Sequence, residues 1–287
     1  MKTSRSWLLF AVLTTIFWGV WGAFIEIPEK AGFPATLGYV MWAIVMIPCS
    51  LVALRLIHWK IEYDLRSIGL GLIVGLLGAG GQLLLFEALR EGPAYIVFPL
   101  ISLFPVLTII LSIVFLKEKS SKRQWAGIIS AVVAAFFLAN PKLSTTGVKG
   151  SHWLWLSAIV FIMWGLQAYF MKFSNATMKA ESIFMYMALS GVLLIPVALW
   201  MTDFSIVINW GLKGPYLAAI VHLLNAVGAL MLVYALRYGK AIIVVPMTGL
   251  SPVITIVISL MLYAVMPGIA LTIGIGLAVI AIFLLSE

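Results

Sequence analysis

Long apolar stretches separated by short polar ones dominate this chain. Because a helix that crosses the hydrocarbon core of a bilayer needs about 20 mostly apolar residues, ten of these stretches are placed as membrane-spanning helices. Their ranges are 7–27, 35–56, 67–89, 94–116, 123–140, 153–173, 182–201, 215–236, 241–264 and 268–286. The pattern therefore predicts an all-α integral membrane protein with ten transmembrane helices joined by short connections.

Part of this pattern occurs twice along the chain. When residues 87–138 are aligned with residues 234–285 without a gap, 21 of the 52 positions are identical. Matched Arg, Gly and Pro residues exclude chance similarity between apolar helices; they pair Arg90 with Arg237, Gly92 with Gly239, Pro99 with Pro246 and Pro105 with Pro252. The pairs Trp18-Gly19 and Trp164-Gly165 extend the match more weakly. The chain is thus predicted to consist of a first five-helix repeat (1–140), a polar linker (141–152) and a second five-helix repeat (153–287).

The two repeats are predicted to have opposite orientations in the membrane. Five spans is an odd number, so the second repeat enters the bilayer from the other side. Inverted-topology repeats are common in secondary transporters, which alternate access around a site near the midplane. A duplication retained only for folding is the alternative. The arrangement favours a transporter whose substrate lies between spans 1, 3, 4, 6, 8 and 9.

Composition and charge restrict the class of protein further. Hydrophobic residues make up 63% of the chain, compared with roughly 45–50% in soluble domains, so an ordinary soluble protein is excluded. The net charge of +8 reflects topology and not a nucleic-acid partner. Thirteen Lys and Arg residues lie at the ends of the spans on the side of the N-terminus, and five lie at the other ends. The positive-inside rule then predicts a cytoplasmic membrane protein with both termini in the cytoplasm.

The sequence has no pattern typical of a cofactor or a metal site. Cys49 is the only cysteine, and neither a Gly-rich phosphate loop nor a His/Glu metal spacing occurs. We expect no cofactor, no metal and no catalytic residues. An intramembrane lipid-modifying enzyme is the alternative of another class, and it would need several convergent polar residues near one leaflet.

Polar and aromatic residues within the spans are the candidate substrate-binding residues, because intramembrane polar groups are costly. His222 and Asn225 lie three residues apart on one face of the eighth span. His222 can relay a proton, which makes a proton the candidate coupling ion, or both residues can join helices by hydrogen bonds. Trp18 and Trp164 lie near mid-depth, although Trp prefers the interface. They can clamp an apolar or cationic solute or only pack. Further candidates are Trp21, Gln82 and Gln167.

Two acidic residues near the outer ends of the spans are further candidates. Glu26 and Glu87 can bind the charged end of a zwitterion, or Glu87 can pair with Arg90 three residues on. Substitution of both acids by Gln separates an amino-acid transporter from an exporter of organic cations, because the loss of an acid should weaken transport of a cation most.

Prolines inside the apolar runs are the candidate gating residues. A proline within a helix removes a donor and bends the helix, and in lipid the freed carbonyl needs a partner or a water-filled cavity. Pro105 and Pro252 are predicted to lie near the midplane, with Pro99 and Pro246 closer to opposite faces. Gly249 adds local flexibility. Spans 4 and 9 are therefore predicted to be paired gating helices; static kinks that only shape packing are the alternative.

Taken together, these features resemble the EamA-type transporters of the drug/metabolite transporter superfamily. The similarity rests on the Trp-Gly pairs, the two A-L-R-x-G turns, Pro105, Pro252, and FLKEKSSKRQWAGI at 115–128. It implies ten helices around a central cavity and secondary transport of small organic solutes. In this family a Glu often precedes the mid-helix proline. Phe104 and Ser251 occupy these two positions in this chain, and Ser251 is a candidate substrate-binding residue. YAVMPG at 263–268 also replaces the Lys-Glu turn in the second half.

The favoured substrate is an amino acid or a similar small polar metabolite, because the candidate residues mix neutral polar groups with aromatic rings. An exporter of amphipathic organic cations or drugs is the alternative, which the Trp content favours. Two small-xxx-small faces, one at Gly127 and Ala131 and the other at Gly274 and Ala278, are candidate scaffold or homodimer contacts.

Overall fold

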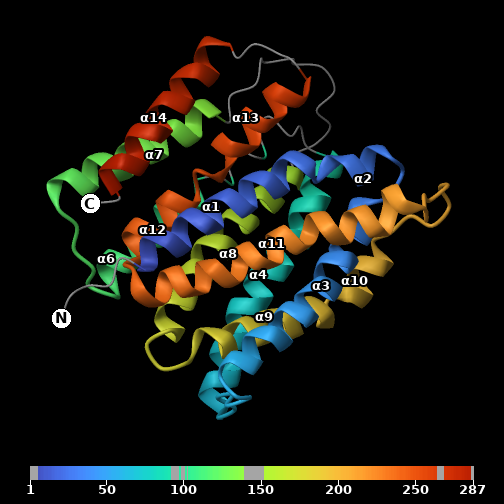
Figure 1. Ribbon diagram of the computed structural model, residues 1–287, viewed down its shortest axis with the longest axis horizontal. Coiled ribbons are helices and arrows are strands. Elements are labelled where there is room, and N and C mark those ends of the chain that lie inside the picture. The colour runs from blue at the N-terminus through green and yellow to red at the C-terminus, as the bar shows by residue number, and fades with distance from the viewer. Residues whose placement is uncertain are drawn as a thin grey trace.

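The computed structural model describes residues 6–91, 97, 101, 103–138, 152–263 and 268–285, and the regular structure of these residues is helical (Figure 1). The helices are α1 (Ser6–Phe24), α2 (Glu26–Lys30), α3 (Ala35–Leu56), α4 (Leu65–Glu91), α6 (Phe104–Val114), α7 (Lys122–Leu138), α8 (His152–Ser174), α9 (Ala180–Leu193), α10 (Ile195–Trp200), η1 (Leu212–Tyr216), α11 (Leu217–Tyr238), α12 (Ala241–Thr248), α13 (Ser251–Tyr263) and α14 (Ile269–Leu285).

Six helical stretches are long and apolar enough to cross a membrane. They are Ser6–Lys30, Ala35–Leu56, Leu65–Ala88, His152–Ser174, Ala180–Trp200 and Leu212–Tyr238. They correspond to predicted spans 1, 2, 3, 6, 7 and 8. Predicted spans 4, 5, 9 and 10 contain shorter helices, namely α6, α7, the α12–α13 pair and α14. Within the described residues, the structure thus confirms an all-helical fold and, for six of the ten predicted spans, a helix long and apolar enough to cross a membrane.

The helices pack in pairs that the two halves repeat. In the first half α1 packs against α11 and α13; in the second half the equivalent helix α8 packs against α4 and α6. Likewise α3 contacts α11 while α9 contacts α4, and α3 and α9 also contact each other. Each interface of one half therefore recurs in the other, as an internal two-fold relation requires.

Two hydrogen bonds between helices also occur at equivalent positions of the two halves. The Thr108 hydroxyl donates to the Gly165 carbonyl at 2.9 Å, and the Thr255 hydroxyl donates to the Gly19 carbonyl at 2.8 Å. Thr108 matches Thr255 in the sequence repeat, and Gly165 matches Gly19. The sequence repeat is therefore also a repeat of contacts between helices.

A close contact between a glycine and a tryptophan also occurs at equivalent positions of the two halves. A Cβ atom on Gly81 would lie 2.6 Å from Nε1 of Trp164, and one on Gly228 would lie 2.5 Å from Cδ1 of Trp18. Only a residue without a side chain lets each indole lie directly against the neighbouring backbone. The two Trp residues near mid-depth are thus placed by glycines on α4 and α11.

The ninth predicted span is broken, not bent. Helix α12 ends at Thr248 and α13 begins at Ser251, so Pro252 stands in the first turn of a new helix. Pro105 likewise stands in the first turn of α6. A proline in the first turn needs no hydrogen-bond donor, because the first amides of a helix have no intrahelical partner. The prediction that Pro105 and Pro252 kink continuous helices is therefore wrong. Pro246 does lie inside a helix, and Pro99 lies outside the described residues.

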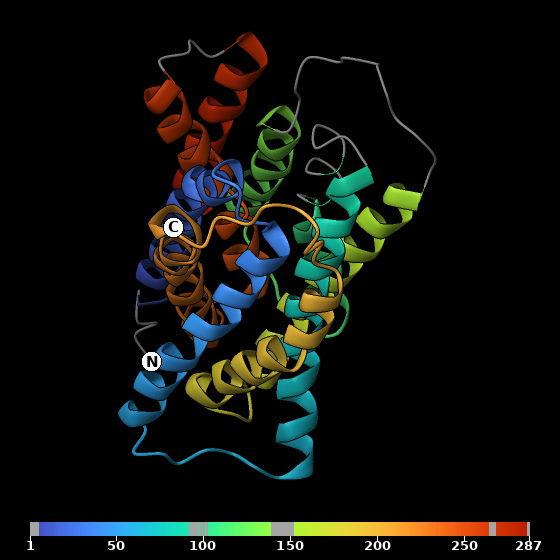
Figure 2. The same cartoon turned by 90° about the vertical axis from the view of Figure 1, so that its right-hand side faces the viewer.

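Helices α7 and α14 form a pair at one corner of the molecule, away from α3 and α9 (Figures 1 and 2). A Cβ on Gly127 would lie 2.9 Å from Cγ of Leu285. Ala131 and Ala278 are also buried. These small residues thus make contacts within the chain, as the scaffold alternative predicts, and the homodimer contact stays a prediction.

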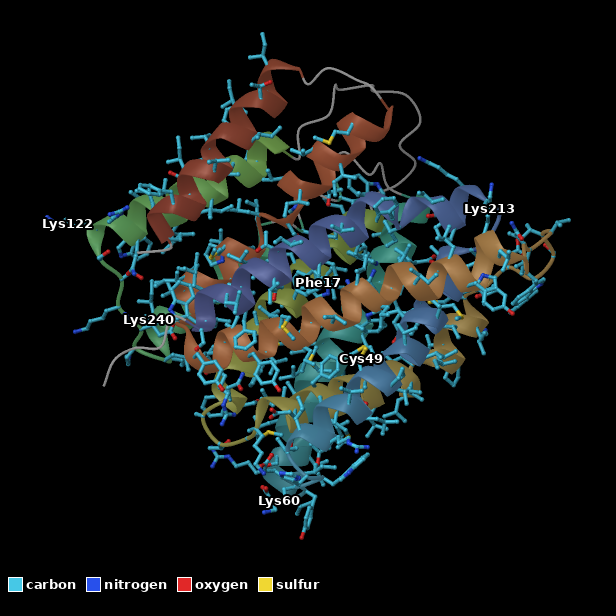
Figure 3. The ribbon with its side chains drawn as sticks, in the orientation of Figure 1. Phe17, Cys49, Lys60, Lys122, Lys213 and Lys240 are labelled. Carbon is cyan, nitrogen blue, oxygen red and sulfur yellow. The ribbon has the colours of Figure 1, made fainter. Side chains whose placement is uncertain are left out.

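The connections divide the molecule into two ends with different charge. We call "basic end" the end formed by the turns at 57–64, 115–121, 175–179 and 239–240. Lys60, Lys122 and Lys240 lie at this end, and Lys213 lies far from them (Figure 3). At the opposite end, Asn209 of the 201–211 connection donates to the Ala31 carbonyl at 2.8 Å.

Hydrogen bonds and one ion pair hold the basic end together. Lys179 pairs with Glu62 at 3.3 Å, and its backbone N–H donates to the same carboxylate at 3.2 Å. Burial acts to raise the pKa of Glu62, but the hydrogen bonds from Ser182 and Lys179 and the charge of Lys179 outweigh it and lower the pKa. Asp64 accepts from the Ser67 side chain and from its backbone N–H at the start of α4, and these bonds lower the pKa of Asp64.

Candidate functional site

A group of polar and aromatic side chains lies where α11 meets α1 and α3. The indole N–H of Trp21 donates to Nδ1 of His222 at 3.2 Å, and that of Trp42 donates to Oδ1 of Asn225 at 2.8 Å. The indole N–H of Trp18 donates to the Asn225 carbonyl at 3.2 Å. We call these five residues the Trp–Asn cluster. They join three membrane-spanning helices through groups that lipid cannot satisfy.

Helix geometry explains why the cluster forms. His222 and Asn225 lie about one turn apart on α11, and Trp18 and Trp21 lie one turn apart on α1, so the two pairs face each other along the contact. Gly38 on α3 lets the imidazole approach, since a Cβ there would lie 3.2 Å from Nε2 of His222. The close approach buries His222, which is 6% exposed.

The contact with Trp21 determines the protonation state of His222 in this conformation. Nδ1 accepts a hydrogen bond and so carries a lone pair, which places the ring proton on Nε2 of a neutral imidazole. Taking up a second proton would break the bond with Trp21. His222 as a proton relay stays a prediction, and it requires this contact to open.

The equivalent positions of the other half lack these polar groups. In the sequence repeat, Gly75 and Gly78 on α4 stand where His222 and Asn225 stand on α11. A Cβ on Gly75 would lie 2.2 Å from Oγ of Ser190, and one on Gly78 would lie 2.1 Å from Nε2 of Gln167. The first-half face of α4 therefore packs closely, while the equivalent face of α11 carries the cluster. Packing of the fold does not require a His and an Asn there.

The remaining substrate-binding candidates on α4, α8 and α13 make other contacts. Gln167 and Trp164 contact α4, and Trp164 also makes an edge-to-face contact with Phe104 at 6.0 Å between ring centroids. The Nε2 group of Gln82 is buried and has no hydrogen-bond partner among the described residues. Ser251 begins α13 next to α1, because a Cβ on Gly19 would lie 2.9 Å from the Ser251 carbonyl oxygen.

The two acidic candidates lie at the end of the bundle opposite the basic end. Glu87 is half-buried near the end of α4, and Glu26 begins α2. The side chains of Glu26 and Arg90 lie outside the described part of the structure, so the predicted pairing of Glu87 with Arg90 stays a prediction.

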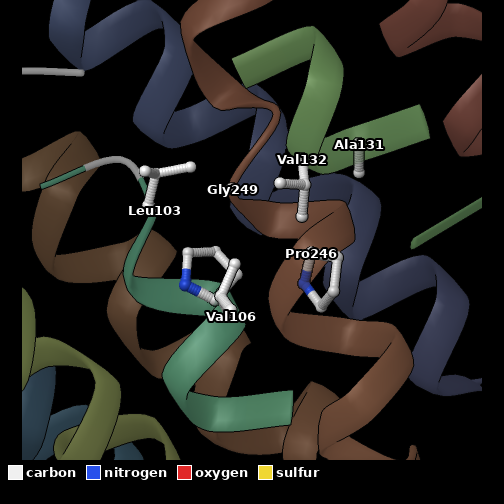
Figure 4. Close-up of a pocket in the computed structure, with 7 residues that line it drawn as sticks. Leu103, Val106, Ala131, Val132, Pro246 and Gly249 are labelled. Carbon is white, nitrogen blue, oxygen red and sulfur yellow. The ribbon is translucent and has the colours of Figure 1, made fainter. Parts of the chain in front are cut away.

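Three of the predicted gating residues meet where spans 4 and 9 cross. Pro105, Pro246 and Gly249 line a pocket together with Leu103, Val106, Ala131 and Val132 (Figure 4). A Cβ on Gly249 would lie 3.2 Å from Cγ of Pro105. The cavity volume is only about 10 Å³, far less than the roughly 300–1,000 Å³ of pockets that hold small organic ligands. The lining is apolar, so the pocket suits movement between helices better than recognition of a polar solute.

Comparison with known proteins assigns the family. The model of the EamA-like transporter family matches residues 5–140 and again residues 151–287. The chain belongs to the EamA-like transporter family. Together with its six long apolar helices, this membership identifies a multi-pass membrane transporter of the drug/metabolite transporter superfamily.

Relatives of this EamA-like transporter are similar over part of its length. The uncharacterized protein MJ1333.1 of Methanocaldococcus jannaschii is 31% identical over 132 residues, which are 46% of this chain and 95% of that protein. Protein LicB of Haemophilus influenzae is 28% identical over 190 residues, 59% of this chain and 64% of LicB. A crystal structure with 14% identity superposes with a TM-score of 0.77 over 96% of this chain and 97% of the other. At that identity the likeness shows a shared fold.

Two features of this transporter were not predicted from its sequence. Trp42 lies well inside α3, away from the interface that Trp prefers, and this signal, already used for Trp18, could have identified it. Glu118 binds the start of α12, and nothing in its sequence context reveals that partner. Within the described residues, no group of three His, Cys, Asp or Glu side chains could hold a metal ion.

Proposed function

We propose that this transporter moves a small polar organic solute across the cytoplasmic membrane by alternating access, and that the Trp–Asn cluster binds the solute. The observation that carries the proposal is the difference between the two halves. Intramembrane His and Asn side chains are costly, and the other half forms the same helix contacts with Gly75 and Gly78 in their place. Binding explains why one half bears this cost.

The chemistry of the cluster supports a neutral or zwitterionic solute such as an amino acid. Three indole N–H groups donate hydrogen bonds within the cluster, and the imidazole of His222 is neutral. Trp42 binds Oδ1 of Asn225, whereas Nδ2 makes no hydrogen bond within the described residues. Nδ2 is therefore the donor that supports recognition of a carboxylate or a hydroxyl group.

Thermal stabilisation of the purified protein tests this proposal. A ligand that binds the folded state raises the unfolding temperature by mass action, so a panel of amino acids, polyols, choline-like amines and drugs is screened. We expect small polar solutes to stabilise the wild type, and Asn225→Leu to remove most of that shift. Asn175→Leu is the matched control, because it also removes an interhelical hydrogen bond (to the Val233 carbonyl, 3.1 Å) but lies outside the cluster. Shifts that persist in Asn225→Leu would exclude the cluster as the binding site.

An amphipathic organic cation is the second candidate, because the three Trp rings of the cluster can bind a cation through their faces. Loss of an acidic group should weaken binding of a cation most. Glu26→Gln and Glu87→Gln therefore separate the candidates: the stabilisation by an amine falls if the substrate is a cation, and the stabilisation by an amino acid changes less.

The charge distribution supports a proposal for orientation. The basic end carries Lys60, Lys122 and Lys240 and receives the last turn of α11 with Arg237. The positive-inside rule supports a cytoplasmic orientation of this end, and we propose that both termini lie on the same side. Impermeant thiol labelling in intact cells tests this: in a Cys49→Ala background, Lys60→Cys should be protected and Lys213→Cys labelled.

A further inference from the structure

A carboxylate at the basic end holds the start of the broken ninth span. Oε1 of Glu118 accepts the backbone N–H of Ala241 at 3.1 Å, and Oε2 accepts that of Ile242 at 2.9 Å. Next to these bonds, Nζ of Lys240 donates to the Lys119 carbonyl at 2.6 Å. The first amides of a helix lack intrahelical partners, and bonds to a carboxylate are the strong, charge-assisted kind. The 115–121 turn and α12 are therefore tied together.

The helix held in this way is central to the molecule. All eight residues of α12 are buried, and the helix ends at the break before α13. Pro246, within α12, lines the pocket at the crossing with α6. On its other side α12 touches α1, where the Thr15 hydroxyl donates to the Met247 carbonyl at 3.4 Å. A movement of α12 would therefore displace residues both at the crossing with α6 and on α1, the helix that carries Trp18.

A second charged side chain holds the preceding corner. Nζ of Lys172, on α8, donates to the carbonyls of Leu236 at 2.8 Å and Gly239 at 2.6 Å, at the end of α11. Its positive charge also interacts with the carboxylate of Glu118. The corner between α11 and α12 is therefore held from two sides, by an anion at the start of one helix and a cation at the end of the other.

A carboxylate stands at this position in the first half of the chain and not at the matching position in the second half. Val265 stands at the position of the second half that matches Glu118, within YAVMPG. A valine has no carboxylate to bind helix amides, so the repeat cannot form the same contact at the opposite end. A contact required by the fold would be expected in both halves, as the bonds from Thr108 and Thr255 are.

We propose that Glu118 is a latch that keeps the basic end closed, and that this end opens when the carboxylate leaves the first turn of α12. The inference rests on the proposed alternating-access cycle. Its test measures access of a reagent to the protein and uses no solute, so failure of the latch and failure of solute transport give different results.

Thiol labelling of single-cysteine variants tests the latch. Cys49→Ala removes the native thiol, and cysteine is then introduced either at Val244 in α12 or at Val106 in the pocket. In purified protein, Glu118→Gln should increase the rate at which a polar, charged maleimide labels both positions by about tenfold or more, because a charge-assisted bond is lost. Asp64→Asn is the matched control, since Asp64 binds the start of α4 at the same end; it should leave both rates unchanged.

Three outcomes would overturn the proposal. Unchanged labelling in Glu118→Gln means that the carboxylate does not keep the end closed. Faster labelling of Val244→Cys alone means that the first turn of α12 frays without opening the pocket. An equal increase in Asp64→Asn means a general loosening of the basic end. If Glu118→Gln does not fold, Glu118→Asp is measured instead; its shorter side chain should increase both rates to a smaller degree, and unchanged rates overturn the latch.

Discussion

Single glycines on α4 decide how closely the two halves approach. A Cβ on Gly81 would lie 2.6 Å from Nε1 of Trp164, whereas a Cβ on Gly69 would meet no atom within 4 Å. We therefore predict that Gly81→Ala lowers the free energy of unfolding by about 1–3 kcal/mol through overpacking. Gly69→Ala should be neutral or stabilising by up to about 1 kcal/mol, from helix propensity. Thermal unfolding of the two variants in the same detergent checks this, and equal effects would contradict the close packing.

The paired threonines give a second prediction for single residues. Thr108→Val and Thr255→Val each remove one hydrogen bond to a glycine carbonyl of the other half. Each should destabilise the protein by about 0.5–1.5 kcal/mol, and the two costs should be similar because the bonds are equivalent. Unfolding midpoints of the two variants and of the double variant measure this. A large cost for one and none for the other would show that the two-fold relation does not extend to energetics.

Individual site residues differed in how far the sequence could predict them. The spacing of His222 and Asn225 placed them on one face of a helix, and the structure shows that face against α1 and α3. The position of Trp42 well inside α3 could have identified it as a candidate, whereas Glu118 was missed because its role depends on which helices become neighbours. That neighbourhood is a property of the assembled bundle and leaves no mark in local spacing.

The local sequence of α12 favours a break, because Pro246 lies inside this helix. Pro246 leaves the Ile242 carbonyl without its usual donor. We predict that Pro246→Ala restores that bond and raises thermal stability, by up to about 3 kcal/mol, while slowing solute flux, because the helix can no longer bend there. Pro34→Ala is the control. Pro34 precedes α3, so the N–H that alanine introduces there has no helix carbonyl to bind. Flux at the native rate in Pro246→Ala would remove this proline from the gate.

The connections at the basic end give a prediction of pH dependence. The pKa of Glu62 is lowered in the folded protein, so its contribution to stability is complete above the unfolded value of about 4.5. That contribution is lost as the pH falls through the lower, folded value. The difference in unfolding temperature between wild type and Glu62→Gln should therefore be constant from pH 7 to 5 and shrink below about pH 4. A difference that grows on acidification would contradict the ion pair with Lys179.

Element prediction succeeded where the hydrophobic pattern was long and uninterrupted. Six predicted spans are continuous enough to cross a membrane, whereas spans 4 and 9 contain several prolines and begin new helices at Pro105 and Pro252. Hydropathy measures whether a segment can lie in lipid. It does not say whether a proline bends a helix or starts one, which depends on the contacts around Leu103 and Gly249.

For the whole molecule, the repeat could be recognised in the sequence from its matched Arg, Gly and Pro residues. The structure repeats other contacts between its halves, those of Thr108 with Gly165 and of Thr255 with Gly19. The residues to which we assign solute binding and the latch are residues that differ between the two halves. His222 and Asn225 stand at the positions that match Gly75 and Gly78 of the other half, and Glu118 has Val265 as its counterpart. A symmetric scaffold with one binding cluster and one latch is the simplest account of these differences.

Solute flux into proteoliposomes tests this account most directly. Liposomes containing the wild type, Asn225→Leu or Asn175→Leu are given the labelled solute that stabilises the protein best. We predict saturable uptake by the wild type and by Asn175→Leu, and a loss of at least about tenfold in Asn225→Leu, since a hydrogen bond in the site is worth about 1.4 kcal/mol or more. Uptake no faster than into empty liposomes, by a wild type that binds the solute, would contradict transport. Equal uptake by all three proteins would contradict the cluster as the transport site.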